Sequence, residues 1–116
     1  MTATALAAME TAFFAQAIPR NPEDIKRIAH ILKAISHPTR LNILCVVSDG
    51  PLSISEIQER VGGTQSAISQ HVEVMRTRGI LVSRREGNRV LCSVSDANVV
   101  ELVGHMRKVF CPAKSN

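Results

Sequence analysis

The spacing of hydrophobic residues predicts helices over the first half of the chain. Residues 3–17, rich in Ala, Leu, Met and Phe, predict a first helix. After the Asn21-Pro22 cap, apolar residues recur at helical spacing and predict a second, at Ile25, Ile28, Ala29, Leu32 and Ile35. Ser36-His37-Pro38 ends it and begins a third helix, whose stripe is Leu41, Leu44, Cys45 and Ser48. Asp49-Gly50-Pro51 then predicts a turn.

Two further helices are marked by capping residues. Ser53-Ile54-Ser55-Glu56 is a capping box and begins a short helix that runs to about Val61. Gly62-Gly63 breaks this helix, and Thr64 can cap the next one, which runs to about Arg78. Its expected inward positions are Ile68, Val72 and Met75.

The hydrophobic period then changes. Residues 80–86 and 89–94 predict two strands, and Gly87-Asn88 between them predicts a two-residue hairpin turn. Ser95-Asp96 begins a last helix that ends at Cys111-Pro112. Its apolar residues are Val99, Leu102, Val103, Met106, Val109 and Phe110.

The order of these elements predicts one winged helix-turn-helix domain over residues 1–116. Its class is mainly α with a small β-hairpin (α+β), with five helices before the hairpin and one after it. The helix-turn-helix spans 53–78 and the wing spans 80–94. No apolar run could cross a membrane, and the alanine-rich start lacks a basic leader, so we expect a cytoplasmic protein with no membrane partner. The odd number and wide spacing of the cysteines argue against a disulfide scaffold.

Positive charge is concentrated in one third of the chain. Residues 60–92 hold six arginines and two acidic residues, so this segment carries the whole net charge of +4. Such a concentration is typical of a surface that binds a polyanion, although a solvated arginine-rich face is the alternative. The chain has three Phe and neither Trp nor Tyr, which argues against base-stacking platforms for single-stranded RNA.

The helix after Thr64 and the hairpin tip carry side chains suited to double-stranded DNA. Hydroxyls and amides can bond to base edges in the major groove or to phosphates, and a basic hairpin can reach phosphates or an adjacent minor groove. A solvent-exposed helix, or a winged helix that contacts only proteins, is the alternative. The predicted DNA-binding residues are Ser53, Ser55, Thr64, Gln65, Ser66, Ser69, Gln70, His71, Arg84, Arg85, Asn88 and Arg89.

Three motifs between residues 34 and 94 carry a family resemblance. They are His37-Pro38-Thr39-Arg40, the QSAISQH stretch at 65–71 and the RGILV stretch at 78–82. Together they resemble the ArsR/SmtB family of bacterial repressors. The resemblance implies a homodimer that binds palindromic operator DNA and releases it when an inducer binds. It also implies a dimer interface formed by residues 1–20 and 96–111, for which an ordinary intrachain core is the alternative.

The metal sites of that family are incomplete in this sequence. The thiolate site uses two cysteines as CxC in the third helix, where this chain has only Cys45, and soft metals need two or three close thiolates. The other site uses Asp and His residues of the last helix, where this chain offers Asp96, Glu101 and His105 without a second His. We therefore expect no metal and no other cofactor.

Cys45 in the third helix and Cys111 at the end of the last are similar to the pair in the BigR/SqrR/YgaV branch of the family. This resemblance implies that reactive sulfur species or oxidants join the two thiols in a disulfide or polysulfide bridge, which releases the operator. Lys108, one turn before Cys111, could favour its thiolate.

Alternatives to this switch stay open. Cys45 could be a buried small residue and Cys111 an incidental one. The protein could also be a metalloid- or metal-responsive repressor with Cys45 and Cys111 as thiolate ligands. Cys92 is expected to pack under the hairpin. The chain has no CxxC pair and no phosphate-binding loop, so we do not expect an enzyme.

Overall fold

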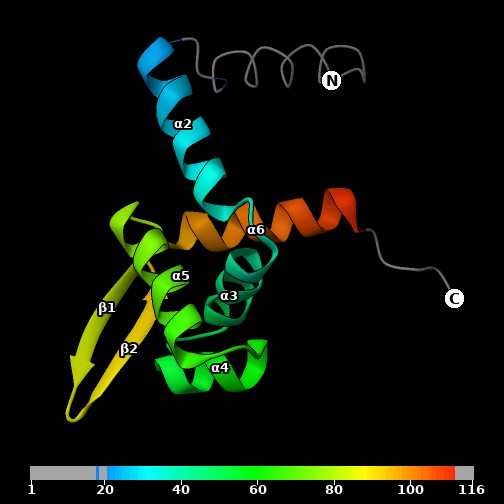
Figure 1. Cartoon of the computed structure of the whole chain (residues 1–116). Helices are drawn as coiled ribbons and strands as arrows, with labels where there is room; N and C mark the ends of the chain where they lie inside the picture. The colour runs from blue at the N-terminus through cyan, green and yellow to red at the C-terminus, as the bar shows by residue number, and fades with distance from the viewer. Residues whose placement is uncertain (1–17, 19–20, 112–116) are drawn as a thin grey trace, which may run out of the picture. The chain divides into compact units, whose positions relative to one another are not determined.

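The computed structural model describes Ile18 and residues 21–111. The first predicted helix, at 3–17, lies outside the described residues, as does nearly all of the predicted dimerisation arm at 1–20. Contacts divide the chain into two units, residues 1–30 and residues 31–116, and the boundary falls inside a helix. The described elements are α2 (Pro22–Ile35), α3 (Pro38–Ser48), α4 (Ile54–Val61), α5 (Gln65–Thr77), β1 (Leu81–Glu86), β2 (Arg89–Val94) and α6 (Ala97–Phe110) (Figure 1).

Local capping explains where the helices of the second unit begin. The predicted capping box is confirmed: Ser53 Oγ accepts from the Glu56 N–H at 3.2 Å, and Glu56 Oε1 accepts from the Ser53 N–H at 3.1 Å. Thr64 Oγ1 accepts from the Ala67 N–H at 3.0 Å and begins α5. Residues 62–63 between α4 and α5 are glycines with φ of +89° and +84°, a conformation that side chains with a Cβ rarely adopt.

The core of the second unit lies where α3, α4, α5 and the hairpin meet. The predicted inward positions of α5 are confirmed, and Ile57 of α4 faces the same core. The predicted stripe of α3 is wrong at Leu41 and Cys45, which are exposed, whereas Ile43 and Val47 are buried. Almost every position of α3 between 41 and 47 is apolar, so packing by α4, α5 and β2 selects the buried side.

Helices α2 and α6 leave apolar side chains in solvent. In α2 only Ala34 and Ile35 are buried. No residue of α6 is fully buried, although Val99, Val103 and Met106 pack against the core. The exposed large side chains on these helices are Ile25, Ile28, Leu32, Leu102, Val109 and Phe110.

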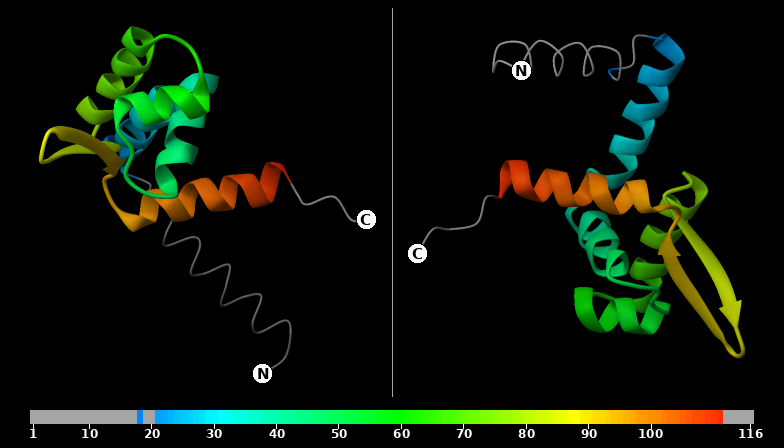
Figure 2. Two further views of the ribbon diagram at one scale, coloured as in Figure 1. Left: turned by 90° about the horizontal axis from the view of Figure 1, so that it is seen from below. Right: turned by 180° about the vertical axis from the view of Figure 1, so that it is seen from behind.

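The two strands form the antiparallel hairpin that the alternating pattern predicts. Their register runs from Leu81 opposite Val94 to Glu86 opposite Arg89, and Gly87 in the turn has a φ of +61°. Figures 1 and 2 show the turn at the free end of the hairpin, away from α5 and α6. A backbone bridge between Leu52 and Cys92 attaches β2 to the segment before α4. Among the described residues, no helix is long and apolar enough to cross a membrane.

Candidate nucleic-acid interface and cysteine sites

One side of α5 is polar and open to solvent. The opposite side carries Ile68 and Val72 into the core, so the helix is held in place while its outer side stays free. The hydroxyls of Ser53 and Thr64 accept the capping N–H groups, and each keeps its own O–H to donate. The exposed predicted DNA-binding residues of the two helices and their connection are Ser55, Thr64, Gln65, Ser66, Ser69 and Gln70.

His71 differs from the other predicted DNA-binding residues of α5 because it is half-buried. Its ring lies against the ring of His37, with centroids 4.7 Å apart and planes inclined by 42°. His37 caps α3, and its Nδ1 accepts from the Thr39 N–H at 3.1 Å. Burial, followed by the charges of His37 and Arg40, lowers the pKa of His71 below its usual range. The sequence motifs contained both histidines, but only the fold brings them together.

The wing carries the remaining predicted DNA-binding residues, and all of them are exposed. Arg84 lies 3.7 Å from the Glu86 carboxylate. Arg89 forms an ion pair with Glu56 of α4. Arg85 forms no ion pair within residues 21–111. The guanidinium of Arg85 is therefore the one at the hairpin tip that no carboxylate of the described chain neutralises.

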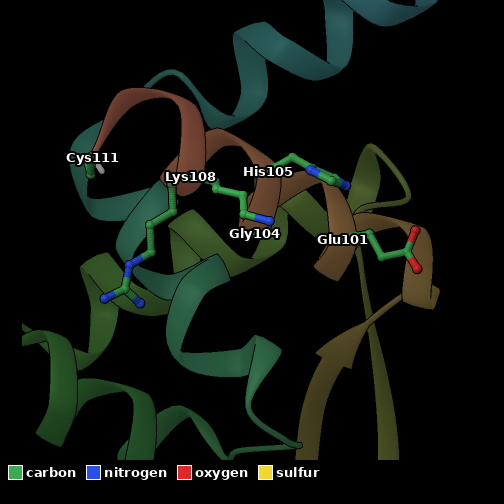
Figure 3. Close-up of a pocket in the computed structure, with 6 residues that line it drawn as sticks. Glu101, Gly104, His105, Lys108 and Cys111 are labelled. Carbon is green, nitrogen blue, oxygen red and sulfur yellow. The ribbon is translucent and has the colours of Figure 1, made fainter. Parts of the chain in front are cut away.

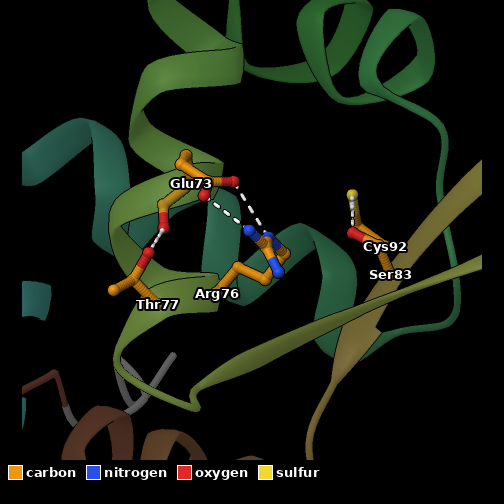
Figure 4. A network of polar contacts seen from close by, with 5 residues as sticks. All are labelled: Glu73, Arg76, Thr77, Ser83 and Cys92. Atoms are coloured by element: carbon orange, nitrogen blue, oxygen red, sulfur yellow. Dashed lines mark hydrogen bonds and ion pairs between the residues drawn. The ribbon is translucent and has the colours of Figure 1, made fainter.

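On α5, an ion pair also neutralises one of the arginines. Arg76 Nε and Nη2 donate to the two oxygens of the Glu73 carboxylate at 2.9 and 2.5 Å, and Thr77 Oγ1 donates to the Glu73 backbone oxygen at 2.8 Å (Figure 4). The hydrogen bond to Arg76 is the main cause that lowers the pKa of Glu73. Three of the six arginines between residues 60 and 92 thus face carboxylates. One of these carboxylates, that of Glu56, lies outside residues 60–92. The net charge of that segment therefore did not predict the pairing of Glu56 with Arg89.

The three cysteines occupy different environments, and all have free thiols. Cys45 on α3 and Cys111 at the end of α6 are exposed, so the interpretation of Cys45 as a buried small residue is wrong. Cys92 is buried under the hairpin, as predicted, with its Sγ 3.9 Å from Ser83 Oγ (Figure 4). Burial raises the pKa of Cys92, and the contact with Ser83 opposes this increase.

Helix α6 brings a positive charge to Cys45. The pKa of the Cys45 thiol is raised, mainly by partial burial; the Arg107 guanidinium opposes this rise, and the Asp49 carboxylate adds to it. Arg107 also accepts, through its backbone oxygen, the Cys111 N–H at 2.8 Å. Sequence reasoning singled out Lys108 and missed Arg107, since the proximity of Arg107 to α3 depends on how α6 packs.

An open groove follows α6 toward its C-terminal end. Figure 3 shows the labelled lining residues along this helix, with Cys111 at its end. The groove is lined by Glu101, Gly104, His105, Arg107, Lys108 and Cys111. Asp96, the other acidic residue that the sequence offered on this helix, caps it by accepting from the Asn98 N–H at 2.7 Å. No three His, Cys, Asp or Glu side chains within the described residues are grouped to hold a metal ion.

Sequence comparison places this chain beside known regulators. Residues 37–83 match the model of a family described as "Bacterial regulatory protein, arsR family". The chain is 39% identical over 88 residues to the HTH-type transcriptional regulator YgaV of Escherichia coli (strain K12), covering 75% of this chain and 89% of that protein. It is 32% identical over 84 residues to the Biofilm growth-associated repressor of Xylella fastidiosa (strain 9a5c), covering 72% and 74% of the two chains.

Solved structures agree with this placement. HlyU from Vibrio cholerae N16961 superimposes with a TM-score of 0.72 at 30% identity, covering 78% of this chain and 99% of that one. The transcriptional repressor BigR from Xylella fastidiosa superimposes with a TM-score of 0.69 at 30% identity, covering 80% and 99%. The polar outer side of α5 and the basic hairpin therefore lie on a scaffold shared with transcriptional regulators.

Proposed function

Because this chain belongs to the ArsR family of bacterial regulatory proteins, we propose that it is a homodimeric repressor that releases its operator when Cys45 and Cys111 become linked. Its relatives are DNA-binding transcriptional regulators, and the chain is a regulator of this kind and not an enzyme.

The proposed DNA contacts follow from the geometry of α5 and the wing. The N-terminal part of α5 enters the major groove, where the Gln65 amide can form paired hydrogen bonds with adenine. Arg85 and Arg89 contact phosphates beside it, which position the domain without reading sequence. His71 is half-buried against His37, so its proposed role in DNA binding is limited to the edge that solvent reaches.

The proposed dimer uses the apolar side chains that α6 leaves exposed. Val109 is 68% exposed and Phe110 is 78% exposed, and Leu102 lies on the same helix. Side chains of this size in water favour a partner surface. A two-fold dimer presents two copies of α5 to half-sites about one DNA turn, roughly 34 Å, apart.

The proposed switch is a two-step thiol reaction with a low-molecular-weight persulfide. One cysteine thiolate attacks the terminal sulfur of R–S–SH, which forms a protein persulfide and releases RS⁻. The second thiolate attacks the protein-bound sulfur of that persulfide, which forms the Cys45–Cys111 disulfide and releases HS⁻. A further persulfide molecule lengthens the bridge by one sulfur before closure. The protein thiols lose two electrons and the persulfide gains them, so no other oxidant is needed.

The observation that carries this proposal is the contrast among the three thiols. Cys45 and Cys111 are exposed to a dissolved reagent, whereas Cys92 is buried. Partial burial raises the pKa of the Cys45 thiol, and Arg107, whose charge opposes this rise, is on the same helix as Cys111. A covalent link between α3 and the end of α6 would move α6, and thereby the proposed dimer interface, relative to α5.

Operator binding and mass spectrometry on the same samples test the proposal. Reduced protein should bind operator, and protein treated with persulfide should lose binding in proportion to the Cys45–Cys111 linkage. Full linkage with unchanged operator binding would contradict the switch. Release by arsenite with all thiols reduced would instead support the metalloid-responsive alternative. One relative, HlyU, bears the name "Transcriptional activator", so a promoter-reporter assay would decide between repression and activation for this chain.

A further inference from the structure

An ion pair joins the wing to the first helix of the helix-turn-helix. Arg89, at the start of β2, donates through Nη2 to Oε1 of Glu56 in α4. The two residues are 33 positions apart in the chain. Arg85, on the other strand near the same turn, has no such partner within the described residues. Arg89 and Arg85 therefore differ before DNA binds, because Arg89 is paired with a carboxylate and Arg85 is unpaired within the described residues.

The backbone determines that Glu56 and Arg89 meet. Leu52 and Cys92 are bridged in antiparallel fashion, with N···O distances of 3.0 and 2.7 Å. Moving back along β2 from Cys92 to Arg89 therefore corresponds to moving forward from Leu52 toward Glu56. The capping box fixes the Glu56 carboxylate at this end of α4, because the same Oε1 accepts from the Ser53 N–H.

A carboxylate and a phosphate are the same kind of partner for an arginine. Both offer charged oxygens that a guanidinium can bind in a two-point contact. We propose that Glu56 competes with DNA phosphate for Arg89, and that it thereby holds the wing against α4 and weakens binding to non-specific DNA. This inference rests on the proposed phosphate contact of Arg89. Glu56 is a positioning residue in this scheme, since it acts on DNA only through Arg89.

The exposure of the pair sets the size of the effect. The side chains of Arg89 and Glu56 are 58% and 39% exposed, so water and salt screen their attraction. Exposed ion pairs of this kind are weak, and their removal should change an affinity by about two- to fivefold. Competition of this strength suits a contact that must break each time the wing meets DNA.

The chain offers a substitution that removes the competition and keeps the cap. Glu56→Gln loses the charge, but a glutamine at this position still completes a capping box. Glu59→Gln is the matched control, because Glu59 is exposed on the same helix and forms no ion pair within the described residues. The affinity for random-sequence duplex DNA is measured over a salt series for four variants. They are Glu56→Gln, Glu59→Gln, Arg89→Ala and the Glu56→Gln/Arg89→Ala double variant. Melting curves establish that each variant is folded.

The proposal predicts a two- to fivefold gain in affinity for Glu56→Gln beyond that of Glu59→Gln, with a steeper dependence on salt. The gain should vanish when Arg89 is alanine. Equal effects of the two glutamine substitutions, a gain that persists without Arg89, or a loss of affinity in Glu56→Gln would each overturn it. If Arg89→Ala leaves DNA binding unchanged, the proposed phosphate contact itself fails, and this result is distinguishable from the others.

Discussion

The ring of His71 in α5 lies 4.7 Å from the ring of His37, which caps α3. This contact connects the proposed DNA-reading helix to the first turn of a core helix. Burial lowers the pKa of His71, and His37 and the nearby Arg40 guanidinium lower it further. Protonating His71 would place a positive charge in a half-buried contact near Arg40, so this contact should make the fold sensitive to acid.

We expect stability to fall as pH decreases below about 6.5, the ordinary pKa of histidine. His71 has a lowered pKa in the folded state, so the unfolded chain binds more protons in this window. The stabilisation is therefore complete above the unfolded pKa and is lost as pH falls toward the folded one. Urea unfolding between pH 5 and 7.5 measures this slope. His71→Gln should flatten it, whereas His105→Gln, at an exposed position on α6, should not.

Arg85→Ala should weaken binding to operator and random DNA to a similar degree. Arg85 is exposed and unpaired within residues 21–111, which suits a phosphate contact. The slope of log K against log salt should fall in magnitude by about 1. Arg76→Ala, which removes an arginine already paired with Glu73, should change the slope less. An unchanged slope with lost sequence preference would make Arg85 a base-reading residue.

Gln65→Ala should reduce discrimination between operator and random DNA. A paired hydrogen bond from glutamine to adenine contributes roughly 1–3 kcal/mol of discrimination, which is about 5- to 150-fold. Gln65 is at the start of α5, and Gln70 lies about one and a half turns later. Gln65→Ala should therefore reduce discrimination more than Gln70→Ala does. Competition gel shifts with both DNAs measure the ratio. Equal losses on the two DNAs would remove Gln65 from the groove.

Cys45→Ser and Cys111→Ser should each bind operator normally and fail to release it after persulfide treatment. Each variant lacks one of the two thiols needed to close the bridge. Cys92→Ser should still respond, because its thiol is buried, although placing a hydroxyl there should lower the melting temperature. A normal response in Cys111→Ser would refute the two-cysteine switch.

Arg107→Gln should slow alkylation of Cys45 near neutral pH by a few-fold. Burial raises the pKa of the Cys45 thiol and the charge of Arg107 opposes this rise, so removing Arg107 should raise the pKa further and reduce the fraction of reactive thiolate. The rate is measured with iodoacetamide in a Cys111→Ser background. Lys108→Gln removes the neighbouring charge on α6 and serves as the control. Equal rates in the two variants would show that proximity to Arg107 does not set Cys45 reactivity.

Several features could be predicted from the sequence because they are determined within a few residues. The capping box at 53–56, the threonine cap at 64 and the hairpin turn at 87–88 depend on hydrogen bonds and backbone conformations of adjacent positions. The buried side of α5 was also predictable, since polar and apolar residues alternate there at helical spacing. The resulting element order was sufficient to predict a winged helix-turn-helix.

Only the tertiary structure decided relationships between distant positions. Almost every position of α3 between 41 and 47 is apolar, so no pattern there selects the buried side, and the exposure of Cys45 depended on the helices and strand that pack there. The contacts of His37 with His71, and of Glu56 with Arg89, join residues more than 30 positions apart. Such pairs depend on how rigid elements are placed in space, which no local spacing of residues encodes.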